Sequence, residues 1–140
     1  MTGRTIHELT LGETARFTKT ISESDVYGFA GITGDFNPVH VDQVAAEASM
    51  FGTRIAHGML TASLISTVLG LQLPGPGAIY VSQSTRFVKP VLIGDTITAE
   101  AEVVELLVEK NRARLATRCL NQRGEVVLEG ESILMPHRFQ

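Results

Sequence analysis

The chain has 140 residues, of which 44% are hydrophobic and 19% are charged, and its formal net charge at pH 7 is −3. This length and composition predict one folded domain, residues 1–140, with a true core, and they exclude a disordered chain. The small negative charge gives no reason to expect nucleic-acid binding, and the apolar segment Gly58–Leu73 is too short and too often interrupted to span a membrane.

The cysteine content and the first residues of the chain indicate the cellular compartment of the protein. Cys119 is the single cysteine, so no intrachain disulfide can form, which favours a reducing compartment. It lies in a strand-like run, where a buried, unreactive thiol is expected. Residues 1–10 lack the apolar stretch of a secretory signal peptide. We therefore expect a cytoplasmic protein.

The first elements read as a strand followed by a helix. Glu13–Ile21 alternates in side-chain character, as a short strand does. Ser22 and Asp25 have the spacing of a capping box, which predicts the start of a helix. Gly34 follows the apolar stripe of that helix and is expected to end it.

The middle of the chain predicts a turn, a short helix and a long buried helix. Asp35–Val41 contains Asn-Pro, which favours an extended turn rather than a helix. Asp42 can cap a short helix that runs to Ala48. Gly58–Leu71 is apolar on most sides, so we expect a buried central helix. Leu73–Gly77 is rich in proline and glycine and should stop it.

The second half of the chain is β-like. Turn signals separate four runs, Ala78–Val88, Asp95–Leu107, Arg112–Asn121 and Glu125–Met135. Residues 103–108 fit a strand or a helix by pattern alone, and the flanking hairpin signals favour a strand. Together the elements predict an α+β fold, a curved antiparallel sheet wrapped around the central helix. Such a sheet leaves edges and an outer face that need cover, so we expect a homodimer.

Asp35 and His40 are the candidate acid/base pair. They lie five residues apart in a turn that Asn-Pro makes rigid, and a carboxylate and an imidazole can divide proton donation and water activation between them. The alternative is structural, because Asp is common in turns and a loop histidine needs no function.

Gly58 offers a different component. At the first turn of a helix its N–H is an unpaired donor, and the absent side chain lets a ligand approach the backbone, as oxyanion stabilisation requires. It can equally be a flexible residue before a core helix. For His57, a structural or hydrogen-bonding role is favoured over a catalytic one.

Other kinds of site are weak in this sequence. Asp35, Asn37, His40, Asp42 and His57 could supply metal ligands, but no recognised ligand spacing supports a metal. The sequence has no nucleophile elbow, and its glycines lack the dinucleotide-binding context, so no cofactor is expected. Ser66 is expected to bond back to its own helix.

The segments Tyr27–Ala30, Asp35–His40 and His57–Leu60 together resemble the MaoC-like hydratase family. The resemblance extends from about Glu13 to the last strand. More narrowly, the chain is similar to the short bacterial (R)-specific enoyl-CoA hydratases that supply polyhydroxyalkanoate synthesis. This resemblance implies a homodimeric hot-dog fold and reversible hydration of trans-2-enoyl-CoA to (R)-3-hydroxyacyl-CoA.

The resemblance also implies roles for individual residues. Asp35 and His40 match the catalytic pair, and Gly58 matches the residue whose N–H binds the thioester oxygen. Asn37 matches the asparagine of the motif, which implies that it orients the pair, and Ser66 matches a serine near the active site with a supporting role at most. Three alternatives stay open: a 3-hydroxyacyl-thioester dehydratase acting on acyl carrier protein substrates, a hot-dog thioesterase, and a non-catalytic acyl-CoA-binding protein.

Overall fold

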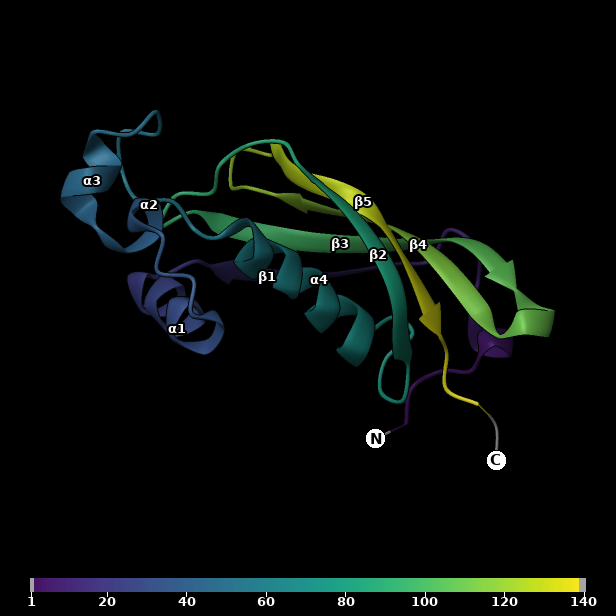
Figure 1. Ribbon diagram of the computed structural model, residues 1–140. Coiled ribbons are helices and arrows are strands. Elements are labelled where there is room, and N and C mark those ends of the chain that lie inside the picture. The colour runs from purple at the N-terminus through teal and green to yellow at the C-terminus, as the bar shows by residue number, and fades with distance from the viewer. Residues whose placement is uncertain (1, 139–140) are drawn as a thin grey trace.

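A five-stranded antiparallel sheet in the order β1-β3-β4-β5-β2 dominates the computed structural model, which describes residues 2–138 (Figure 1). The strands are β1 (Thr14–Thr20), β2 (Ile79–Phe87), β3 (Thr96–Leu107), β4 (Arg112–Leu120) and β5 (Val126–Met135). Each expected strand is confirmed to within one residue at both ends. Of the ambiguous residues 103–108, residues 103–107 belong to β3, where β4 pairs with them, whereas Val108 begins a short 3₁₀ turn.

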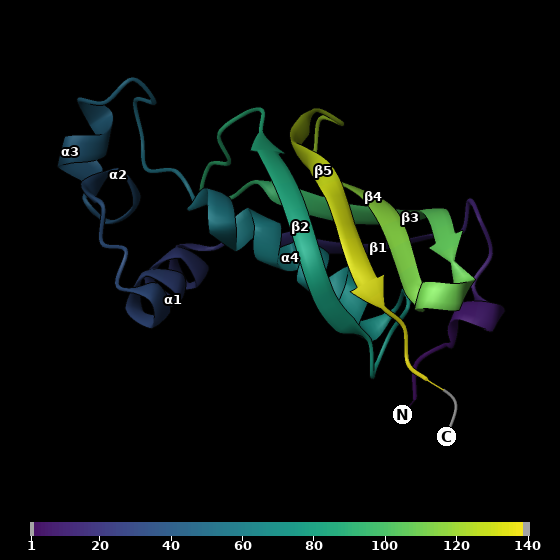
Figure 2. The same ribbon diagram turned by 45° about the vertical axis from the view of Figure 1, so that its right-hand side comes forward.

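The helices fall into two groups. Helix α4 (Gly58–Leu71) lies along the sheet, as the hot-dog arrangement requires, whereas α1 (Glu23–Thr33), α2 (Pro38–Val41) and α3 (Gln43–Glu47) lie beyond one end of it (Figures 1 and 2). Two short 3₁₀ turns, η1 (Ile6–Glu8) and η2 (Val108–Lys110), complete the described elements. No helix within residues 2–138 is both long and apolar enough to cross a bilayer.

The helix α1 begins and ends at the expected residues. The Asp25 N–H donates to the Ser22 hydroxyl at 3.0 Å, and the Ser22 N–H donates to the Asp25 carboxylate at 2.9 Å. Gly34 adopts a φ of +81°, which glycine tolerates, and its N–H donates to the Ala30 carbonyl. This end releases the chain toward Asp35.

The expected turn over Asp35–Val41 is partly wrong, because Pro38–Val41 forms the short helix α2. Proline suits the first position of a helix, where its missing N–H would have no partner. The Asn37 side chain caps the helix by accepting from the Val39 N–H at 3.4 Å. The Asn-Pro pair therefore starts a helical turn rather than preventing one.

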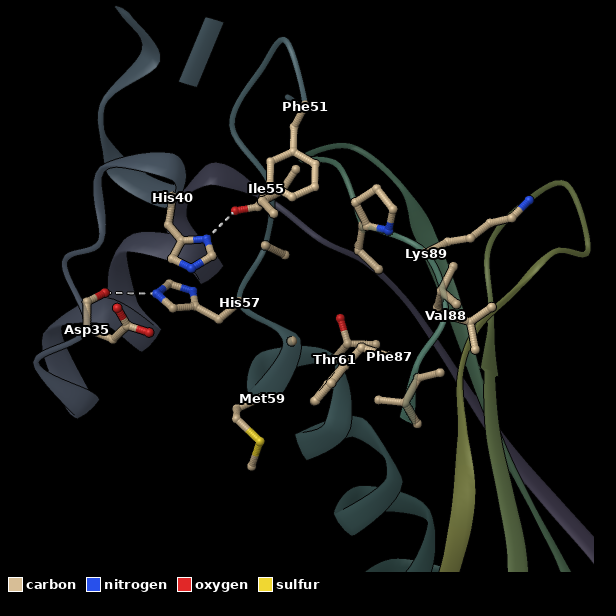
Figure 3. A pocket seen from close by; sticks show the side chains of 16 residues that line it. Asp35, His40, Phe51, Ile55, His57, Met59, Thr61, Phe87, Val88 and Lys89 are labelled. Carbon is tan, nitrogen blue, oxygen red and sulfur yellow. Dashed lines mark hydrogen bonds between the residues drawn. The ribbon is translucent and has the colours of Figure 1, made fainter. Parts of the chain in front are cut away.

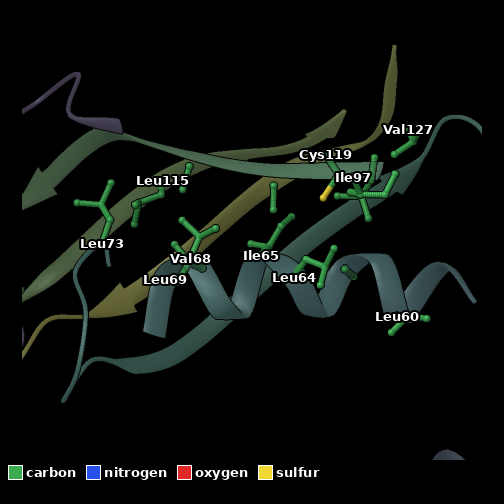
Figure 4. Close-up of a cluster of buried hydrophobic side chains, with 14 of the residues drawn as sticks. Leu60, Leu64, Ile65, Val68, Leu69, Leu73, Ile97, Leu115, Cys119 and Val127 are labelled. Carbon is green, nitrogen blue, oxygen red and sulfur yellow. The ribbon is translucent and has the colours of Figure 1, made fainter. Parts of the chain in front are cut away.

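The core lies between α4 and strands β1, β3 and β4. Ile65, Val68 and Leu69 are fully buried and rise from α4 toward the sheet (Figure 4). Cys119 lies opposite them, and its S–H donates weakly to the Thr61 carbonyl at 3.8 Å. Burial raises the pKa of the Cys119 thiol to about 12, so it is the unreactive thiol that the sequence predicts.

A row of alternating charges crosses the outer face of the sheet. Arg16, Glu100, Arg118, Glu129 and Arg86 stand in register on β1, β3, β4, β5 and β2. Glu100 lies 2.8 Å from the Arg118 guanidinium and 3.7 Å from that of Arg16, and Arg86 pairs with Glu129. This row of ion pairs is suited to contact with water, so it gives no reason for a partner to cover this part of the sheet.

The two edge strands differ in character. The exposed residues of β1 are polar, three threonines and Arg16 among them. In contrast, β2 exposes large apolar side chains, Ile79, Tyr80, Val81 and Phe87. Because α4 packs chiefly against β1, β3 and β4, it leaves the apolar side chains of β2 without cover.

Candidate active site

Arg54 holds the helices beyond the sheet together. Its guanidinium donates to the Glu23 carboxylate at 2.6 Å and to the Gln43 side-chain oxygen at 2.8 Å, and it also contacts the Tyr27 hydroxyl. The Arg54 guanidinium lowers the pKa of Glu23 through this bond. One side chain therefore links α1 and α3 to the connector before α4, which fixes the segments that carry Asp35 and His40.

His40 is buried, and its protonation pattern follows from its partner. Its Nδ1 lies 2.7 Å from the Ile55 carbonyl oxygen, which can only accept, so Nδ1 carries the proton. In the neutral ring Nε2 is therefore an unprotonated acceptor. The Ile55 N–H also donates to the Val39 carbonyl at 3.1 Å, which locks α2 against the connector. This arrangement is the one that a general base needs.

Asp35 is exposed in the loop between α1 and α2. Its N–H donates to the Thr33 hydroxyl at 3.1 Å, and its carboxylate accepts from the Asn37 N–H at 3.2 Å. Its carbonyl accepts from Nε2 of His57 at 3.0 Å. The first two bonds are local and shape the loop. The bond from His57 attaches the loop to the start of α4.

His57 lies between the two candidate residues (Figure 3). Its ring stacks on His40 with centroids 3.9 Å apart and planes 26° apart, and the Phe29 ring lies 4.9 Å away. Only 2% of His57 is exposed. The sequence left the direction of this side chain open, and the structure supports the hydrogen-bonding role.

Gly58 is the first residue of α4, as the sequence predicts. Its N–H lies in the first turn, where a helix supplies no internal acceptor. The His57 carbonyl starts the helix by accepting from the Leu60 and Thr61 N–H groups at 3.0 and 3.3 Å. The unpaired donors at this end, together with the helix dipole, favour negative charge.

Asp35, His40, His57 and Gly58 line one cavity of about 470 Å³. Its other walls are mostly apolar and include Phe87, Val91, Val127, Leu128 and Thr61. The Thr61 hydroxyl points into this space (Figure 3). The cavity thus joins a polar end, which can do acid/base chemistry, to an apolar region that can hold a hydrocarbon chain.

The other two predicted site residues do not line the cavity. Asn37 is exposed and caps α2, so its contact with the pair runs through its N–H to Asp35. Ser66 lies on the exposed side of α4, and the expected bond back to its own helix is formed instead by Ser63 to the Leu60 carbonyl at 2.6 Å.

Three members of the possible metal-ligand set do meet. The donor atoms of Asp35, His40 and His57 lie within 4.8 Å of one another. However, the two rings stack, so their in-plane lone pairs run along nearly parallel planes instead of converging on one ion. The arrangement favours proton transfer over metal binding.

A comparison with protein families matches residues 8–122 to the MaoC like domain. Among curated proteins, the chain is 54% identical over 124 residues to an (R)-specific enoyl-CoA hydratase of Rhodospirillum rubrum, covering 89% of this chain and 85% of that protein. It is also 54% identical over 127 residues to a 3-hydroxybutyryl-CoA dehydratase of Methylorubrum extorquens, covering 91% and 80%.

The solved structures agree with this result. An unliganded R-hydratase from Pseudomonas aeruginosa superposes with a TM-score of 0.92 at 46% identity, covering 97% of this chain and 88% of that one. The family match spans most of the chain, and the solved R-hydratase shares its fold. The chain therefore belongs to the family of MaoC-like domains.

Proposed function

We propose that this chain catalyses the reversible hydration of trans-2-enoyl-CoA to (R)-3-hydroxyacyl-CoA. The observation that carries the proposal is the meeting of Asp35, His40 and the start of α4 at one end of a largely apolar cavity. The relatives named as an enoyl-CoA hydratase and a 3-hydroxybutyryl-CoA dehydratase support it, since these names describe the two directions of one kind of reaction.

The geometry suits addition of water across a conjugated double bond. The oxygen of water attacks C3 and a proton is delivered to C2, so both elements of water enter the product and no cofactor is required. Nε2 of His40 and the carboxyl group of Asp35 form the acid/base pair for these two transfers: one group takes a proton from water, and the other, in its protonated form, gives a proton to C2. They share one coupled site, so the two roles are assigned to the pair.

Negative charge builds on the thioester oxygen during the reaction. The N–H of Gly58 stands at the positive end of α4 and lines the same cavity. A preorganised backbone donor stabilises such an oxyanion without reorganising during the reaction. Because Asp35 and His40 reach the cavity from the same group of helices, water and proton arrive on one face, which gives syn addition and one stereoisomer.

The proposed active form is a homodimer. The exposed apolar side chains of β2, including Val81 and Phe87, lie on an unpaired edge, and a second copy offers the same edge in return. We also propose that residues 1–140 act as one domain in the cytoplasm, where the buried thiol of Cys119 needs no partner.

The direct test is incubation with trans-2-enoyl-CoA of short and medium chain length. Loss of the conjugated ultraviolet band without release of free thiol supports the proposal. Release of thiol identifies a thioesterase, and turnover of the acyl carrier protein thioester in place of the CoA thioester identifies the dehydratase alternative. Binding without turnover identifies a non-catalytic acyl-CoA-binding protein.

A further inference from the structure

His57 touches every part of the candidate site. Its Nε2 bonds to the Asp35 carbonyl, its face stacks on His40, and its own residue caps the helix that begins at Gly58. The proposed reaction uses none of its atoms directly. A buried ring with contacts to all three components can set the distances between them.

The hydrogen bond to Asp35 is the informative contact. The N–H and carboxylate of Asp35 bond to Thr33 and Asn37, which are its neighbours along the chain. Among the bonds of residues 2–138, the one from His57 attaches Asp35 to the element that carries Gly58. Without it, the loop keeps its local shape and Arg54 still holds the helices on either side, but Asp35 loses its direct bond to the residue that precedes Gly58.

The other ring nitrogen of His57, Nδ1, makes an unfavourable contribution to stability. Because the Asp35 carbonyl can only accept, Nε2 of His57 holds the proton, and Nδ1 of the neutral ring is an acceptor. That Nδ1 is buried and has no partner among the described residues. An unsatisfied buried acceptor lowers the stability of the folded state. The benefit of histidine here therefore lies in its Nε2–H and not in a fully satisfied ring.

We propose that His57 is the positioning residue of this site, and that its Nε2–H···O=C bond to Asp35 holds the catalytic carboxylate in register with His40 and Gly58. The inference rests on the proposed hydratase function. It assigns to His57 no contact with the reacting atoms. A shift of about 1 Å in a catalytic group can lower the rate about 100-fold, so the loss of one positioning bond can have a large effect on kcat.

Two variants separate the hydrogen bond from the stack. His57→Phe keeps a flat ring against His40 but removes the donor, whereas His57→Gln keeps an amide N–H that can reach the Asp35 carbonyl but removes the ring. We expect kcat of His57→Phe to fall by about 10- to 100-fold with KM unchanged. His57→Gln should retain most of kcat. The opposite order, equal losses or two fully active variants would overturn the inference.

A measurement on the unaltered protein covers the case in which His57→Phe does not fold, and it does not depend on turnover. Nitrogen-15 correlation spectra should show His57 as the neutral tautomer with a slowly exchanging proton on Nε2. A proton on Nδ1 alone, or rapid exchange at Nε2, would overturn the inference. Failure of wild-type hydration alone would instead remove the proposed function and leave the bond intact.

Discussion

A β-carbon placed on Gly58 would lie 2.6 Å from Cε1 of Phe87, so the phenyl ring fills the space that any side chain at the start of α4 would need. The ring comes from the end of β2, and both residues line the cavity. Glycine at this position therefore makes room for Phe87, which forms the opposite wall of the cavity.

This contact changes what a substitution at Gly58 should do. Gly58→Val is expected to lower kcat by about 10²- to 10³-fold, the loss typical of a missing oxyanion donor, because Phe87 and the branched side chain crowd the helix end. Gly58→Ala should lower it less, and adding Phe87→Leu should restore part of the loss. Steady-state kinetics of the single and double variants measure this coupling.

Gly70 provides the matched control, because it also lies in α4 and a β-carbon there meets nothing within 4 Å. Gly70→Ala should leave the kinetics unchanged and raise stability by up to about 1 kcal/mol. If Gly58→Ala also behaves in this way, the thioester does not approach the start of α4.

Asp35→Asn and His40→Gln should each remove most turnover while the protein stays folded. General acid/base groups contribute about 10²- to 10⁴-fold in rate. The double variant should lose little more than either single one, because both groups act in one transition state. Asp42→Asn is the control, since that carboxylate caps α3 with a side chain that asparagine can replace. Near-normal turnover of Asp35→Asn or His40→Gln would remove that residue from the mechanism.

The edge of β2 should carry the dimer contact. Val81→Lys places a charge among exposed apolar residues on that edge, and it should convert a dimer into monomers in sedimentation equilibrium at micromolar concentration. Thr14→Lys places the same charge on the polar edge strand β1 and should leave the dimer intact. A monomeric wild-type protein, or equal dissociation of both variants, would contradict this assignment.

Acid stability should depend on Glu125. Bonds from Lys89 and Arg123 lower the pKa of this carboxyl from 4.5 to about 2. The unfolded chain therefore takes up this proton first, so the contribution of Glu125 is present above pH 4.5 and is lost as the pH falls toward 2. Glu125→Gln should flatten the dependence of unfolding free energy on pH within this window. Glu109→Gln, at an exposed carboxylate in η2, is the control; an equal effect there would contradict the prediction.

The strands, α1 and α4 could be predicted because their signals are local. Alternating side chains mark each strand, and Ser22 and Gly34 mark the ends of α1. The helix α2 was missed because Asn-Pro fits both a turn and a helix start, and only the fold around His40 decides between them. Ambiguity of this kind is settled by tertiary contacts.

The candidate site divides in the same way. Asp35 and His40 belong to one short motif, and Gly58 belongs to a second motif that follows it in the chain. The structure brings all three to one cavity. Phe87 and Leu128 come from β2 and β5, whose pairing no local pattern specifies. The stack of His57 on His40 is likewise a contact between segments, so the direction of that ring could not be derived from its neighbours.

The measurement that tests the central claim most directly is hydration of a trans-2-enoyl-CoA in D₂O, followed by stereochemical analysis of the product. If Asp35 and His40 deliver water and proton to one face of a substrate held at Gly58, the product is the (R)-3-hydroxyacyl thioester alone, with deuterium at C2 on the face that carries the new hydroxyl. An (S) product, a mixture at C3, or deuterium on both faces of C2 would contradict the account.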